Sequence, residues 1–158
     1  LEVTPYGTEA LSVLRIEKGH AAGAELNGQT TAKQLGLERI VSQTKDSIGR
    51  VLAGRDALQN DTACLVGLQP VTSSDPLVAG AHLVGLGKPI DAAHDLGYVT
   101  SVAYSPHCQS MIGLAYLKEG ASYCGKRIRA VSLLDHQDIE VDVVSPHFVD
   151  PDGERLRV

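Results

Sequence analysis

The stretch Ile139-Glu140-Val141-Asp142-Val143 decides the fold class, because apolar and acidic residues alternate through it. Successive side chains of a β-strand point to opposite faces, so this alternation is typical of a strand with one buried and one solvated face. Other strand-like runs, bounded by turn-forming residues, cover residues 63–68, 81–86, 98–104, 111–117 and 127–134. Short strands at this spacing predict a small antiparallel sandwich or barrel.

The first 60 residues have a helical pattern instead. Thr8 is expected to cap a helix over residues 9–18, which Gly19 ends. Residues 19–31 are interpreted as a loop, and short helices are expected from Thr31 to Leu35 and over residues 47–58. The pattern of the sequence changes from helix-like to strand-like near the pair Asn60-Asp61. We therefore predict an α+β, β-rich fold, in which a short helical N-terminal segment precedes a small antiparallel C-terminal β-barrel.

Composition excludes several functional classes. The chain has 158 residues and a formal net charge of −5, which argues against a broad nucleic-acid footprint. No apolar run approaches the roughly 20 residues of a membrane helix. Three cysteines leave at least one thiol unpaired, which favours a reducing cytoplasm. Because the sequence begins at Leu1 and Met111 is its single methionine, we expect that an upstream part was removed.

Two searches for sites give no strong signal. The six histidines form no H-x-x-x-H or H-E-x-x-H motif, so no metal site is expected. The segment Gly85-Leu86-Gly87-Lys88 lacks the Ser or Thr of a phosphate loop and is interpreted as a turn.

The triplet Ser-Pro-His occurs at residues 105–107 and 145–147, where proline is expected to end a strand.

Glu17 is the one side chain whose position points to binding. It follows Ala10, Val13 and Leu14 along one face of the first helix, so a carboxylate ends an apolar stripe. Its two oxygens form a fork that fits an arginine or the donor edge of a pterin or guanine ring. Helix geometry alone leaves three interpretations open: a ligand contact, an ion pair with an arginine, or a carboxylate that reaches water.

The segment Leu14-Arg15-Ile16-Glu17-Lys18-Gly19 resembles the L-R-x-E-x-G motif of the aminomethyltransferase family, which includes the glycine-cleavage T-protein. Further segments resemble family motifs in the same order along the chain. They are Thr31 with Gly36-Leu37, and residues 45–50, 65–68, 97–101, 105–106 and 112–115. The chain departs from the family pattern at Ala32, Arg39 and Ser47, which puts the packing near the pocket in question.

Two flanking segments narrow the resemblance. Residues 4–10 and 146–156 are similar to the C-terminal region of alpha subunits of heterotetrameric sarcosine oxidases. This implies that residues 1–60 are the C-terminal part of a folate-binding domain and that residues 61–158 are the family's barrel domain. It also implies a part in the oxidative demethylation of sarcosine, with tetrahydrofolate receiving the one-carbon unit to give glycine and 5,10-methylenetetrahydrofolate.

The resemblance carries expectations for the site. Glu17 is expected to accept hydrogen bonds from the pterin, and Lys45 lies where family members place basic residues near folate; a solvated lysine is the alternative. The family's catalytic carboxylate lies in the preceding half, so no catalytic residue is expected here and the chain alone is expected to be inactive. FAD or FMN and NAD are expected only in other regions or subunits.

The expected partners are the other oxidase subunits, the preceding half of the alpha subunit and the small-molecule folate, without nucleic acid or membrane. A homodimer through an apolar patch is a further expectation. One alternative is a stand-alone folate-binding or scaffold protein of T-protein type without oxidase activity. Another is an interaction module in which residues 62–158 pack on another subunit.

Overall fold

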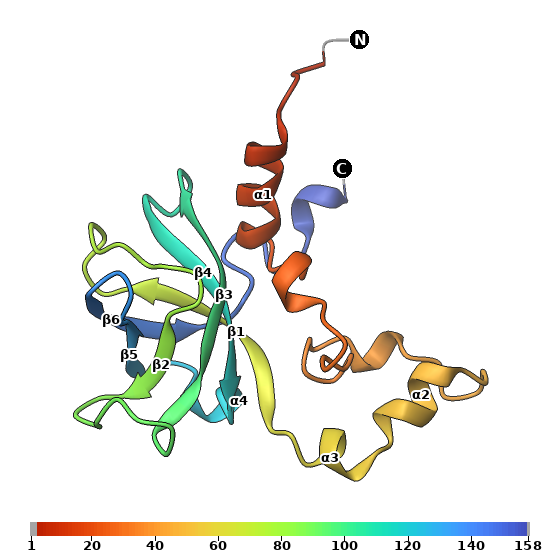
Figure 1. Ribbon diagram of the computed structural model, residues 1–158. Helices are drawn as coiled ribbons and strands as arrows, with labels where there is room; N and C mark the ends of the chain where they lie inside the picture. Colours follow the sequence, from red (N-terminus) through yellow and green to blue (C-terminus); the bar gives the residue numbers. More distant parts are fainter. Residues whose placement is uncertain (1–2, 158) are drawn as a thin grey trace.

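The computed structural model describes residues 3–157, and Leu1 lies outside this range. The chain forms a closed antiparallel β-barrel with a helical N-terminal part (Figure 1). Around the barrel the strands follow the order β1-β4-β3-β2-β5-β6. Their bounds are β1 (Ala63–Pro70), β2 (His82–Gly85), β3 (Asp95–Ser105), β4 (Ser110–Lys118), β5 (Arg127–Ser132) and β6 (Gln137–Val144). The predicted strands and the predicted barrel are confirmed.

The helices are short, and most precede the barrel. They are α1 (Thr8–Glu17), η1 (Gly23–Glu25), η2 (Glu38–Ile40), α2 (Ile48–Ala53), α3 (Asp56–Gln59), α4 (Gly120–Tyr123) and η3 (Glu154–Leu156). None of the helices in residues 3–157 is long and apolar enough to cross a membrane.

Three local expectations for these helices need correction. Thr8 is the first residue of α1 rather than its cap, because the cap position belongs to Gly7. The helix expected from Thr31 to Leu35 is only a turn, since Gly36 adopts a φ of +71° and ends it. The helix expected over residues 47–58 is divided into α2 and α3 by an extended residue, Arg55.

The barrel interior is filled by aliphatic side chains. In β6, Val141 and Val143 are completely buried while Glu140 is exposed, which confirms the alternation of the sequence. They pack with buried residues of the other strands and of the β1–β2 connection, namely Val66, Leu68, Leu77, Ala81, Leu83, Val99, Ala115, Leu117, Ile128 and Ala130. This core holds the six strands of the barrel together.

A second apolar cluster attaches α1 to the outside of the barrel. Ile16 packs there with Leu65, Ile112, Leu114 and Tyr116 from β1 and β4. Ala10 and Leu14 of the apolar stripe are exposed and Val13 is half-buried, because α1 contacts the barrel through its last turn and the rest of the helix points away (Figure 1).

The segment after β6 returns to the end of α1. The backbone N–H groups of Phe148 and Val149 both donate to the carbonyl oxygen of Glu17, at 2.9 and 3.0 Å. Lys18 donates to the carbonyl and the carboxylate of Asp150. Carbonyl groups at a helix C-terminus lack partners within the helix, so this segment caps α1.

The segment between η1 and β1 has almost no core of its own. Across residues 26–62, Gln34 is the one buried residue, and Ile40, Ile48 and Val51 are each more than two-thirds exposed. Figure 1 shows α2 and α3 at the side of the barrel, away from its axis. The division into residues 1–60 and 61–158 stays a prediction.

Candidate functional site

Glu17 is the last residue of α1 and is 7% exposed. Its Oε1 accepts a hydrogen bond of 2.5 Å from the hydroxyl of Ser105, the last residue of β3. Within residues 3–157 no Lys, Arg or His forms an ion pair with it. Neither an arginine partner nor a fully solvated carboxylate therefore describes Glu17.

The second oxygen of Glu17 is reachable from outside. No fully buried side-chain oxygen or nitrogen in the described chain lacks a partner, yet Ser105 contacts only Oε1. It follows that Oε2 retains access to solvent. The carboxylate thus has one oxygen held by the protein and one that can accept from another molecule.

A cavity of about 210 Å³ lies between α1 and the C-terminal segment, and Glu17 is one of the residues that line it. Its lining includes Leu14 and Glu17 from α1, His20, and Asp150 and Arg155 from the chain end. Burial by itself would raise the pKa of Asp150. The Lys18 ammonium and the backbone N–H groups of Arg155 and Glu154 outweigh it, so the pKa of Asp150 lies below its usual value.

A buried polar cluster centred on Glu25 fixes the loop after α1. Thr100 and Ser101 of β3 each donate 2.5 Å hydrogen bonds to Oε1 of Glu25. Oε2 accepts from Arg15 at 2.8 Å and from the backbone N–H of Ala22 at 3.0 Å. Every oxygen of this fully buried carboxylate is therefore satisfied, and both α1 and η1 are tied to the barrel.

The same contacts set the ionisation of Glu25. Burial alone would raise the pKa of this carboxyl group, because it disfavours the charged form. Hydrogen bonds from Ser101, Thr100 and Ala22, with the charge of Arg15, outweigh burial and lower the pKa below its usual value. The carboxylate is consequently charged at neutral pH and has a structural role, with no oxygen left for a ligand.

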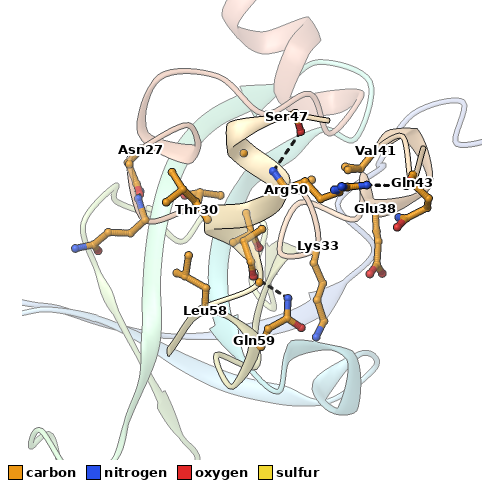
Figure 2. Close-up of a pocket in the computed structure, with 18 residues that line it drawn as sticks. Asn27, Thr30, Lys33, Glu38, Val41, Gln43, Ser47, Arg50, Leu58 and Gln59 are labelled. Atoms are coloured by element: carbon orange, nitrogen blue, oxygen red, sulfur yellow. Dashed lines mark hydrogen bonds between the residues drawn. The ribbon is translucent and has the colours of Figure 1, made fainter. Parts of the chain in front are cut away.

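A larger cavity of about 590 Å³ lies between the turn at residues 27–33 and the helices α2 and α3 (Figure 2). Arg50 lines it, but its guanidinium donates to the carbonyl of Gln43 at 2.7 Å and to Asp46 at 3.1 Å. Ser47 caps α2 by accepting from the Arg50 backbone N–H (Figure 2). The polar groups of this wall therefore serve the local fold.

Lys45 lies on the exposed turn before α2 and lines neither of these two cavities. Its backbone N–H donates to the hydroxyl of Ser42 at 3.1 Å. The structure does not bring Lys45 into the cavity beside Glu17. A role for Lys45 toward folate stays a prediction.

Two polar contacts of the site are absent from the sequence-based expectations. Ser105 belongs to the Ser-Pro-His triplet, which predicts a strand end, and to a family motif at residues 105–106, but no contact with Glu17 is expected from either; β3 does end there. Glu25 lies in a segment interpreted as a loop, and the motif at residues 97–101 contains its partners Thr100 and Ser101. Hydroxyl residues within the family motifs are the sequence signal for such contacts. Only the fold shows which glutamate each hydroxyl contacts.

Metal and thiol chemistry have no organised site in residues 3–157. No group of three or more His, Cys, Asp or Glu side chains there is arranged to hold a metal ion. Cys64, Cys108 and Cys124 are free thiols, which agrees with the expectation of at least one unpaired thiol.

Residues 64–150 match the family described as the glycine cleavage T-protein C-terminal barrel domain, and the chain belongs to this family. The fold is similar to that of the crystal structure of glycine cleavage system aminomethyltransferase T from Bartonella henselae. The TM-score is 0.66 at 25% identity, covering 90% of this chain and 38% of that one.

Two groups of curated proteins are similar to this chain in sequence. Sarcosine oxidase subunit alpha of Rhizobium meliloti (strain 1021) is 39% identical over 158 residues, which cover 99% of this chain and 16% of the relative. Aminomethyltransferase of Francisella tularensis (strain SCHU S4) is 30% identical over 150 residues, 92% of this chain and 38% of the relative. The chain therefore spans about a sixth of the oxidase subunit and less than half of the aminomethyltransferase.

Proposed function

We propose that this chain supplies one wall of a tetrahydrofolate site in a subunit of sarcosine oxidase alpha type. In this proposal the parent enzyme demethylates sarcosine oxidatively, and tetrahydrofolate receives the one-carbon unit. The similarity to sarcosine oxidase subunit alpha, at 39% identity across 99% of this chain, supports the choice of parent enzyme. The membership of the barrel family supports the link to one-carbon chemistry.

The single observation that carries the site is the environment of Glu17. Glu17 is 7% exposed, has no cationic partner among the described residues and is one of the residues that line a cavity. Ser105 occupies Oε1 of this carboxylate, so Oε2 is the oxygen that N–H donors of a ligand can satisfy. The amino group and adjacent ring N–H of a pterin are donors of that kind.

The size of the cavity limits how much of the ligand this chain contacts. Pockets that enclose a whole small molecule measure about 300–1,000 Å³. The cavity beside Glu17 measures about 210 Å³, enough for the edge of a ring system. We infer that other polypeptide forms the remaining walls of the folate site.

Bound tetrahydrofolate would supply the nitrogen atoms that take up the one-carbon unit. Glu17 would accept the pterin donors and so fix the orientation of the ring. The apolar side chains of Leu14 and Val149 would exclude water from one side of it. No residue of this chain is proposed to form or break a covalent bond, and the sites for flavin and NAD are proposed to lie in other regions or subunits.

The exposed apolar residues of the N-terminal part fit the same proposal. Leu11 and Leu14 of α1 are each 51% exposed, and Ile40 and Ile48 exceed 75%. In this proposal other polypeptide covers these residues. Residues 1–60 would then complete a folate-binding domain formed mainly by other sequence, while residues 61–158 form the barrel domain.

The test is calorimetric titration of the full-length protein, in its native assembly, with tetrahydrofolate. Removing a carboxylate that accepts from buried donors costs about 2–5 kcal/mol, so Glu17→Ala should weaken binding by roughly 30-fold or more. Glu9→Ala, on the exposed first turn of the same helix, is the matched control and should bind normally. An unchanged affinity in Glu17→Ala would remove Glu17 from the site.

A second candidate function is a stand-alone aminomethyltransferase-like folate protein without oxidase activity. The 30% identity to aminomethyltransferase over 92% of this chain favours it. Oxygen consumption by the full-length protein with sarcosine separates the two candidates. Sarcosine-dependent consumption supports the oxidase, whereas folate binding without it supports the alternative.

A further inference from the structure

Ser105 occupies a buried position in which its hydroxyl both accepts and donates a hydrogen bond. It is the last residue of β3, is completely buried and precedes Pro106, which has no N–H to offer. The backbone N–H of Cys108 donates to its Oγ at 3.0 Å. That contact uses a lone pair of the hydroxyl, and the one proton remains for another acceptor.

The acceptor is the carboxylate of Glu17, which lies 88 residues earlier in the chain. Ser105 donates its proton to Oε1 of Glu17 at 2.5 Å, so Cys108, Ser105 and Glu17 form an oriented series of hydrogen bonds. The register pair Ser105 and Ser110 closes the β3–β4 hairpin, which holds the series on a rigid element. The carboxylate therefore receives its direction from the barrel as well as from its own helix.

We propose that Ser105 is a positioning residue for folate binding, acting through Glu17. By occupying Oε1 it fixes the plane of the carboxylate and presents Oε2 to the cavity. A preoriented acceptor loses less conformational entropy when a ligand binds, so the hydroxyl contributes affinity without touching the ligand. The inference rests on the proposed function, because it assumes that Glu17 accepts from tetrahydrofolate.

The hairpin offers a matched control for this hydroxyl. Ser110 is paired with Ser105 across the two strands and is 2% exposed, but its hydroxyl accepts from the side chain of Gln69 at 3.2 Å. Ser105→Ala and Ser110→Ala thus remove the same group from two buried positions of the same hairpin. Thermal unfolding of both variants reports any general loss of stability.

The experiment is a double-mutant cycle, measured as the calorimetric affinity of the full-length protein for tetrahydrofolate. A hydrogen bond to a charged group contributes about 1.5 kcal/mol or more, so Ser105→Ala should weaken binding about tenfold. Ser110→Ala should leave the affinity within about twofold. In a Glu17→Gln background, Ser105→Ala should cost less than about twofold, because its route to the ligand is already altered.

Two results would overturn the inference, and they are distinguishable. If Glu17→Gln weakens binding but Ser105→Ala behaves like Ser110→Ala, the positioning role is wrong while the folate site stands. If Glu17→Gln does not change the affinity, Glu17 is not part of the folate site and the positioning role is wrong with it, whereas a parent protein that does not bind tetrahydrofolate contradicts the proposed function itself. Should Ser105→Ala not fold, Ser105→Thr, which retains the hydroxyl, must bind within about threefold of the parent protein for the inference to hold.

Discussion

Arg15 and Glu25 form an ion pair at 2.8 Å in which the carboxylate is completely buried and the guanidinium is largely covered. Arg15 also donates to the hydroxyl of Ser101 at 2.7 Å, so the pair joins the last turns of α1 to β3. Because Arg15 is two residues from Glu17, this pair helps to determine where the candidate ligand-binding carboxylate lies.

Breaking this pair should destabilise the protein strongly. Glu25→Ala removes the carboxylate that accepts from Arg15, Thr100 and Ser101, and the loss of one partner of a buried pair costs about 3–5 kcal/mol. Urea unfolding measures the change. Asp142→Ala removes a partner of Arg127 in an exposed pair on the barrel and should have a much smaller effect on stability. Equal effects of the two substitutions would contradict the structural role of Glu25.

The lowered pKa of Glu25 predicts a dependence of stability on acid. A carboxyl group whose pKa is lower in the folded state stabilises the fold above its unfolded value, about 4.3, and loses this contribution as the pH falls through the folded value. The free energy of unfolding should therefore decrease below about pH 4. In Glu25→Gln the slope over this range should be shallower, and an unchanged slope in urea titrations between pH 5 and pH 2 would argue against it.

Gly19 predicts a steric effect at the end of α1. Its φ is +73°, and an added Cβ would lie 2.5 Å from the carbonyl oxygen of Pro146. Gly36 has nearly the same φ, +71°, with open space around it. Gly36→Ala should therefore cost only the backbone strain of about 1–2 kcal/mol. Gly19→Ala should cost about 2–4 kcal/mol in thermal unfolding, since overpacking is added.

Ile16 and Leu14 provide a direct check of which face of α1 is buried. Ile16 is 2% exposed and Leu14 is 51% exposed. Ile16→Ala should destabilise by about 2–5 kcal/mol, because it removes a buried side chain from the cluster beneath α1. Leu14→Ala should cost less than about 1 kcal/mol. A larger destabilisation by Leu14→Ala than by Ile16→Ala would contradict this assignment of the buried face.

The barrel could be predicted from the sequence because its signal is local. Alternation at residues 139–143 and turn residues between apolar runs report the pleat of each strand, and pleat and burial agree in β6. The packing of α1 could not be predicted in this way. Its burial depends on where the last turn meets β3 and β4, a contact between distant parts of the chain, and the apolar stripe of Leu14 indicates the wrong face.

The candidate site was predictable in part. Glu17 was identified from a carboxylate beside apolar residues and from a family motif, and it does lie at a cavity. Its partner Ser105 lies 88 residues away, and no spacing rule joins them. The turn at Thr31 shows that a correct local signal can still predict the wrong element. Thr31 and Gln34 form the reciprocal hydrogen bonds that are typical of a helix start, yet Gly36 ends the segment after one turn.

A crystal structure of the full-length protein with bound tetrahydrofolate tests the central claim most directly. The account predicts that a Glu17 carboxylate oxygen lies within about 2.7–3.2 Å of the pterin N–H donors, with Ser105 still donating to the other oxygen. A pterin bound elsewhere, or Glu17 paired with an arginine of the protein in that complex, would contradict the account.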